Sequence, residues 1–233
     1  VERIQPENLA PANHTHFGHP AIDRFKSESA DFTNAVAVTP VSAAARASLF
    51  TGKYSSSTGM VINELRLNPN QRAIGHVLTE NGYNTAYIGK WHMYGNCSDH
   101  SSDECAFIPK GPDRLGFNGE WKAYNFHHEN MNSYYYEDKK EKIYYGQGTY
   151  EPEEQFKMAI RSLDRLSGEK KPFALFLSVG VPHDPWTKDN VPAKYYQRYA
   201  NVPFALPSNW SDTPDKYMDR NTDPKRWIDY WKK

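Results

Sequence analysis

The order of the expected elements predicts an α/β fold, in which helices cover the faces of a mostly parallel sheet. Helix signals are repeatedly followed along the chain by strand signals, and this alternation is typical of that fold class. Residues 173–179, Phe-Ala-Leu-Phe-Leu-Ser-Val, form a continuous apolar run that is typical of a fully buried parallel strand. Polar residues of catalytic type follow the expected strands, where α/β folds bind their ligands.

The first unit is expected to be a short helix followed by a strand. Pro20 suits the first turn of a helix that continues through Ile22 and Phe25. Residues 32–38 are rich in Val and alternate in part, which predicts a strand.

The second unit runs from a helix over Gln71 to Gly82 into a strand over 85–88. Ile74, Val77 and Leu78 share one face of the helix, and Gly82 is a residue that commonly ends helices.

The third unit is a helix over about 153–166 followed, after Pro172, by the apolar strand 173–179. Its apolar positions recur at helical spacing and predict the buried face. They are Phe156, Ile160, Leu163 and Leu166.

The amino-acid composition limits the classes of partner that the chain is expected to bind. Lys plus Arg and Asp plus Glu number 28 each, so no net charge favours nucleic acid or a membrane surface as a partner. No run approaches the roughly 18 apolar residues of a membrane span. Aromatic residues make up 14% of the chain, and many lie in the polar stretch 117–150, where they suit either the faces of sugar rings or an irregular cover over the core.

The remaining cysteine and histidine patterns are weak. Cys97 and Cys105 flank a short polar loop and are compatible with a local disulfide, whereas the Asp99-His100 pair between them lacks the spacing of a zinc site. His76 lies inside an expected helix, which favours a structural or exposed position over a ligand.

The whole chain, 1–233, is expected to be part of one catalytic domain, and 188–233 an irregular, loop-rich segment of that same domain. This segment is rich in Pro, Asn, Asp and Tyr, with a final helix around Pro224 to Trp231.

Three segments follow the expected strands and carry the candidate chemistry: 39–52, 89–92 and 180–184. In the first, Ala45 to Phe50 can begin a helix that Gly52 closes, which places Ser42 at a strand-to-helix turn where backbone N–H groups stabilise an anion. Arg46, four residues on, can reach the same place. By itself, Ser42 is better explained as a helix N-cap than as a nucleophile.

Four motifs in order resemble the type I, formylglycine-dependent sulfatases of the alkaline phosphatase superfamily. Residues 42–52 are similar to the family signature Cys/Ser-X-Pro/Ala-X-Arg-X-X-X-X-Thr-Gly, and residues 82–92 to its GYxTAxxGKWH stretch. Residues 20–35 resemble "TPNIDRLA" and "FTNAY", and 173–186 resemble a strand that ends in PHxPW. The resemblance implies an α/β/α sandwich.

It also implies roles for five residues. Ser42 would be oxidised to formylglycine, whose hydrated aldehyde is both the nucleophile and a metal ligand. Arg46 would steady that group, Lys90 would contact the sulfate, and His92 would assist release of sulfate. His183 would face the scissile oxygen as a sulfate contact or a leaving-group acid.

The aromatic segment holds further candidates, because similar sulfatases place substrate-facing loops there. Asn125, His127 or His128 would contact the sulfate or the sugar. The resemblance implies a sulfated carbohydrate substrate, a formylglycine-generating or radical maturase as partner, and a periplasmic or secreted location.

Two departures from the family pattern matter. Ser42 stands where most members have Cys, so it is either matured by a radical enzyme or remains unmodified. The Asp-rich strands that bind calcium in the family are absent from the sequence, so we expect the chain to be part of a longer enzyme, with the first strand, the C-terminal part and the other metal ligands outside it.

Two other functions stay open. One is a phosphate-ester hydrolase of the same superfamily in which Ser42 itself attacks phosphorus. The other is a catalytically inactive homologue that binds sulfated glycans.

Overall fold

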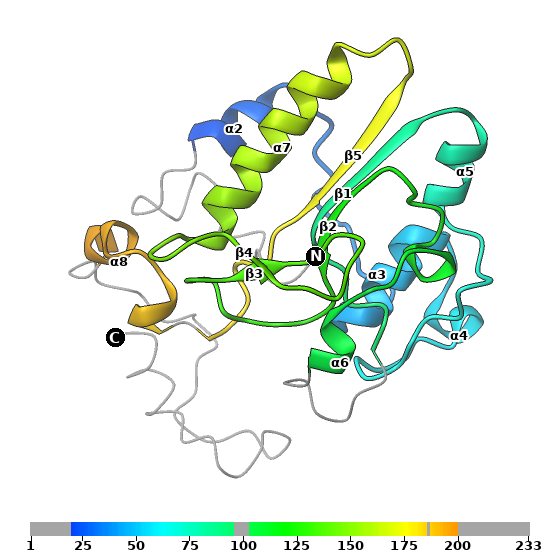
Figure 1. Cartoon of the computed structure of the whole chain (residues 1–233), viewed down its shortest axis with the longest axis horizontal. Coiled ribbons are helices and arrows are strands. Elements are labelled where there is room, and N and C mark those ends of the chain that lie inside the picture. Colours follow the sequence, from blue (N-terminus) through cyan, green and yellow to red (C-terminus); the bar gives the residue numbers. More distant parts are fainter. Residues whose placement is uncertain (1–19, 96–102, 186, 200–233) are drawn as a thin grey trace. The chain divides into compact units, whose positions relative to one another are not determined.

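The computed structural model describes residues 20–95, 103–185 and 187–199. The chain divides into two compact units, Val1–His183 and Asp184–Lys233. The helices of the first are α2 Pro20–Ser27, α3 Ser42–Thr51, α4 Ser55–Thr58, α5 Ile74–Glu80, α6 Asp103–Ala106, the 3-10 turn Pro112–Arg114 and α7 Glu151–Ser167. Its strands are β1 Asn84–Lys90, β2 Glu120–Tyr124, β3 Tyr134–Tyr135, β4 Ile143–Tyr144 and β5 Phe173–Ser178 (Figure 1).

A three-stranded parallel sheet in the order β2-β1-β5 forms the centre of the first unit, and β3 pairs with β4 in a small antiparallel ribbon. β1 is the middle strand and is buried from Thr85 to Lys90. Alternate residues of the sheet point to opposite faces. Each face has its own core, so helices cover both sides and the α/β/α sandwich is confirmed.

The first core lies between the sheet and α3. Phe50 of α3 meets Tyr87 of β1, Phe176 of β5 and Trp91 with ring centroids 5.5–6.1 Å apart. Trp121 of β2 stacks on Tyr87 at 5.2 Å. The second core lies under α7, where Met158 and Ala159 pack with Ile88 and Tyr135.

The expected helices and strands over 20–29, 71–82, 85–88, 153–166 and 173–179 are confirmed as α2, α5, β1, α7 and β5. The helix after Ser42 begins three residues earlier than expected, since α3 starts at Ser42 itself, and Gly52 ends it with φ of 67°. Gly82 follows α5 with φ of 80°.

The strand expected over 32–38 is wrong. These residues form turns and irregular backbone, and the side chains of Phe32 and Val36 are 81% and 89% exposed. A strand requires a partner to satisfy its backbone groups, and no described strand lies against this segment. Val-rich composition alone therefore did not decide the structure.

The apolar faces of two helices are not the faces that pack in the structure. Ile74 and Val77 of α5 are more than a third exposed, and it is Gly75 that packs closely, against Leu115 and Phe117. On α7 only Leu166 of the expected face is buried. The face that meets the sheet is mixed in polarity and consists of Glu151, Pro152, Gln155, Met158, Ala159, Ser162 and Leu166.

β5 is half-buried along its whole length, although it was expected to be fully buried, because it is the last strand of the described sheet. In the second unit, residues Lys188–Asn190 form a 3-10 turn and Ala193–Tyr199 form α8. The helix expected near 224–231 lies outside the described residues. Within the described ranges, no helix combines the length and apolar character that crossing a membrane requires.

Candidate active site

The carboxyl ends of β1, β2 and β5 meet at one edge of the sheet because all three strands are parallel. Lys90 pairs with Tyr124 in register, and Gly89 pairs with Ser178. The ladder continues past β1, where the Trp91 N–H donates to the Tyr124 carbonyl at 2.8 Å. The segments that follow the three strands are thereby held next to one another, as α/β ligand sites require.

Gly89 allows the strands to approach closely at this edge. Its φ is 104°, a conformation that side chains with a Cβ rarely adopt, and a Cβ there would lie 2.1 Å from the Ser178 carbonyl oxygen. No other residue type fits without displacing β5.

Ser42 and His92 form the centre of the site. Ser42 is the first residue of α3, and its Oγ lies 3.0 Å from Nδ1 of His92. Both side chains are buried. His92 has φ of 52°, a strained backbone for a residue of this type that is characteristic of functional positions. The His92 N–H donates to the Asn125 carbonyl at 2.8 Å and holds that backbone.

Arg46 ties α3 to two of the strand ends. Its Nη1 donates to the Lys90 carbonyl at 2.9 Å and to Ser178 Oγ at 2.8 Å. The Tyr87 hydroxyl donates to the same Lys90 carbonyl at 2.6 Å, and burial raises the pKa of Tyr87, which keeps this donor protonated. The guanidinium is thus fixed within one turn of Ser42.

Lys90 brings a second positive charge to this edge, on a side chain that is 1% exposed. Its Nζ lies 5.2 Å from the ring of Phe126, which also contacts His92 at 4.6 Å and His128 at 4.5 Å between ring centroids. The negative face of an aromatic ring stabilises such a cation. Phe126 is therefore a site residue that the sequence analysis did not single out, although it lies in the aromatic segment that was noted.

His183 and His128 face each other across two segments. Their rings stack with centroids 4.0 Å apart and an interplanar angle of 27°. His183 is placed by a turn in which its N–H donates to the Gly180 carbonyl at 3.2 Å. Of the expected substrate-binding group, His128 is thus the member whose side chain stacks on a predicted catalytic side chain.

Asn125 and His127, the other two members, are buried and turned toward the protein. The Asn125 amide oxygen accepts the Tyr94 N–H at 3.0 Å, so it supports the backbone after His92. The Nε2 of His127 lies 3.2 Å from the Tyr134 carbonyl, and its ring stacks on Tyr124 at 3.6 Å. Burial lowers the pKa of His127 to about 3, so the ring is neutral at physiological pH.

The described residues do not by themselves fit a calcium site. Among them, no group of three or more His, Cys, Asp or Glu side chains is arranged to hold a metal ion. Ser42 is accompanied by Arg46 and His92, whereas a hard cation requires several oxygen ligands. We therefore derive no reaction step through a metal.

Cys105 is disulfide-bonded, and the only other cysteine in the sequence is Cys97, which lies outside the described residues together with Asp99 and His100. His76 is structural, because its Nδ1 accepts the Ala73 N–H at 3.2 Å at the start of α5.

The arrangement is suited to an anionic ester. Arg46 and Lys90 bring two cationic side chains to this sheet edge, where the Ser42 hydroxyl contacts His92. The stacked pair His128 and His183 follows the ends of β2 and β5. Cations stabilise the charge of a bound anion and the charge that develops as its ester bond breaks.

Comparison with known proteins identifies the family. A family model described as Sulfatase matches residues 11–218. The chain is 37% identical over 193 residues to an ulvan-active sulfatase of Formosa agariphila, covering 82% of this chain and 35% of that protein. It is 29% identical to an N-acetylglucosamine-6-O-sulfatase of Bacteroides thetaiotaomicron, covering 83% and 31%.

The fold is similar to that of a solved structure of the Bacteroides fragilis protein yidJ. The TM-score is 0.69 at 28% identity, with 86% of this chain and 46% of the other covered. The chain spans about a third of the length of the two curated relatives.

Proposed function

The chain belongs to the sulfatase family, and we propose that the complete protein hydrolyses sulfate esters of a carbohydrate at the sheet edge where β1, β2 and β5 end. The observation that carries this proposal is the Ser42–His92 contact of 3.0 Å beside the fixed Arg46 and the buried Lys90. A sulfate ester is an anion, and this edge offers it two cations and a positioned nucleophile.

We propose further that Ser42 is oxidised to formylglycine. The oxidation removes two hydrogens from the side chain, so it needs an electron acceptor that a maturase would supply. The modified group supplies a geminal hydroxyl as nucleophile and lets the enzyme release sulfate without attack of water on sulfur. The placement of Ser42 at the start of α3, in contact with His92, supports this assignment.

We assign roles to the other residues from the family resemblance, and their contacts support these roles. Arg46 and Lys90 hold the negative charge of the sulfate. His92, whose Nδ1 faces Ser42, accepts a proton from the nucleophilic group. His183 donates a proton to the sugar oxygen as the bond between sulfur and that oxygen breaks, and His128, stacked on His183, holds its ring in place.

A carbohydrate substrate is supported by the relatives and by the small β3–β4 ribbon. The two curated relatives are named for ulvan and for N-acetylglucosamine 6-sulfate. On the ribbon, the exposed ring of Tyr144 lies 5.8 Å from that of Tyr134, and Nζ of Lys142 lies 4.4 Å over Tyr134. Aromatic rings with an adjacent cation suit a sulfated sugar.

Calcium and export remain parts of this proposal. If calcium is required, ligands outside the described residues must hold it together with the formylglycine at position 42. A periplasmic or secreted location fits enzymes that act on sulfated polymers, and fractionation of the native host tests it.

The proposal is tested by sulfate release from N-acetylglucosamine 6-sulfate by the full-length protein expressed with its maturase. We expect turnover that Ser42→Ala abolishes, while Ser48→Ala on the same helix retains it. Hydrolysis of N-acetylglucosamine 6-phosphate with no release of sulfate would favour direct attack by Ser42 on phosphorus. Binding of the sulfated sugar without turnover would favour the inactive glycan-binding homologue.

A further inference from the structure

A buried carboxylate lies beneath the loops that carry the stacked histidines. Glu151 is the first residue of α7, is 0% exposed and belongs to none of the motifs of the sequence. Burying an acidic side chain is unfavourable unless hydrogen bonds compensate it. The contacts of Glu151 show what it holds.

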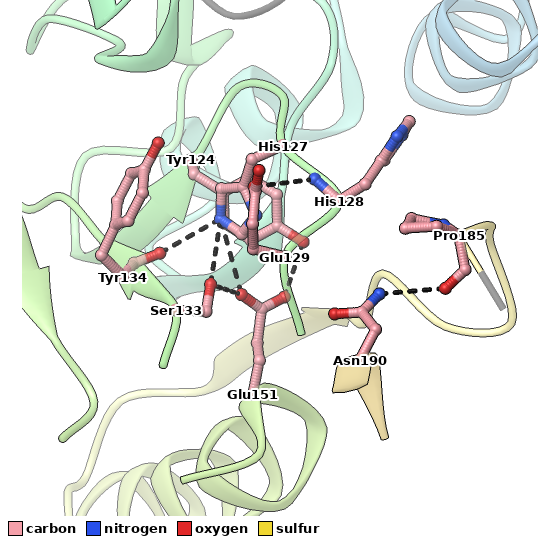
Figure 2. A network of polar contacts seen from close by, with 9 residues as sticks. All are labelled: Tyr124, His127, His128, Glu129, Ser133, Tyr134, Glu151, Pro185 and Asn190. Atoms are coloured by element: carbon pink, nitrogen blue, oxygen red, sulfur yellow. Dashed lines mark hydrogen bonds and ion pairs between the residues drawn. The ribbon is translucent and has the colours of Figure 1, made fainter. Parts of the chain in front are cut away.

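Its two oxygens accept hydrogen bonds from two different segments. The Tyr124 hydroxyl, at the end of β2, donates to Oε1 at 2.8 Å, and the Ser133 hydroxyl donates to Oε2. His127 Nε2 lies 3.5 Å from Oε2 (Figure 2). The Glu151 N–H donates to the Asn130 carbonyl at 2.7 Å. The whole loop 124–133 is therefore anchored to the start of α7.

The third segment is the loop after β5. A Cβ on Gly180 would lie 3.0 Å from the Tyr124 hydroxyl and 3.6 Å from Glu151 Oε1, so this backbone rests directly on the pair. The same loop carries His183, whose N–H donates to the Gly180 carbonyl. One carboxylate thus lies where the loop of His128 and the loop of His183 meet.

We propose that Glu151 is a positioning residue that fixes the His128–His183 pair by holding Tyr124 and Ser133 below their loops. It does not touch the reacting groups. The consequence for catalysis rests on the proposed function, whereas the effect on the two rings does not.

The charge state of the network supports this role. Burial raises the pKa of Glu151 to about 7, and the hydroxyls of Ser133 and Tyr124 oppose that rise. The titratable groups around it are Tyr124, His127, Glu129 and Tyr145, of which His127 is neutral and both tyrosines have a raised pKa. Ionised, this carboxyl accepts both hydroxyls, whereas protonation turns one of its oxygens into a donor, so the ionised form holds Tyr124 and Ser133 best.

The test is histidine NMR of the full chain, with ring signals assigned through His128→Gln and His183→Gln. Stacked rings at 4.0 Å shift each other's ring-proton signals, so these signals report their mutual position. Glu151→Gln replaces one of the two acceptor oxygens by an amide NH2 group, which donates and cannot accept the hydroxyl that faces it. In this variant we expect the ring signals of both histidines to move. In the control Glu154→Gln, whose carboxylate pairs with Lys157 at 2.6 Å on the same helix turn, we expect them to stay.

Tyr124→Phe removes one hydrogen bond from Oε1 and keeps the ring, so it covers the case in which Glu151→Gln does not fold. It is expected to move the same two signals by a smaller amount. If both signals coincide with those of wild type in a folded Glu151→Gln or in Tyr124→Phe, Glu151 has no positioning role. If they move while the wild-type enzyme releases no sulfate, the positioning role stands and the proposed function fails.

Discussion

The pH dependence of stability at Glu151 can be worked out from the structure. Its carboxyl has a pKa of about 7 when folded, raised by burial from the ordinary 4.5. Below pH 4.5 it is protonated in both states. Between pH 4.5 and 7 the unfolded chain loses this proton and the folded chain keeps it. The free energy of unfolding therefore falls by 1.36 kcal/mol per pH unit, or about 3 kcal/mol in total.

His127 acts in the opposite direction. Its pKa is lowered to about 3 from 6.5, so its contribution to stability is present above pH 6.5 and is lost as the pH falls toward 3. Between pH 4.5 and 6.5 the two groups offset each other in wild type. The contribution of Glu151 must therefore be isolated as a difference between two proteins.

The Glu151→Gln variant isolates this contribution, because its side-chain amide does not ionise. We expect the free energy of unfolding of wild type, minus that of the variant, to fall by about 3 kcal/mol from pH 4.5 to 7.5. Urea unfolding followed by fluorescence of the buried Trp91 and Trp121 measures it. Glu154→Gln is the control. A difference that stays constant across this range would show that Glu151 is not a buried carboxyl of raised pKa.

Three further predictions concern the sheet edge. Gly89→Ala places a Cβ 2.1 Å from the Ser178 oxygen, and we expect it to lower the free energy of unfolding, measured in urea, by about 4 kcal/mol or more. For Gly148→Ala, where the Cβ meets nothing within 4 Å, we expect a loss of about 1–2 kcal/mol. Ser178→Ala removes a hydrogen bond from Arg46 and is expected to lower the unfolding free energy by about 1.5–3 kcal/mol; an unchanged midpoint would refute that contact. Lys90→Met is expected to lower kcat/KM for sulfate release by about 100-fold or more with the fold intact, and a loss below threefold would remove Lys90 from the site.

The motif-bearing part of the site could be predicted from the sequence because strand ends are easy to locate when strands are apolar. β1 and β5 were found, and with them the segments of Lys90, His92 and His183. Their meeting at one edge follows from parallel pairing alone.

β2 was not predicted, because Glu120-Trp-Lys-Ala-Tyr124 is only five residues long, contains two charged residues and has no β-branched residue. Without this strand, there was no reason in the sequence to choose among Asn125, His127 and His128 as contacts of the substrate. With β2 in place, the loop begins at a strand end, and the structure separates His128, which stacks on His183, from the inward-facing His127.

Glu151 could not be predicted either, because nothing local distinguishes it from the exposed acidic residues of a helix N-terminus. Its burial depends on Tyr124 and Ser133, which are 27 and 18 residues away in the chain. The wrong apolar face of α7 has the same origin, since this network turned Glu151 and Gln155 inward. Long-range polar contacts overrode helical periodicity.

Oxidation of Ser42 to formylglycine is the step on which the proposed sulfatase activity depends. The most direct measurement is a mass spectrum of the tryptic peptide from Ser27 to Arg46, taken from protein isolated from its native host and treated with an aldehyde-trapping reagent. We expect a peptide lighter than the unmodified one by two hydrogens, together with its trapped adduct. A peptide with unmodified serine and no adduct would contradict this expectation.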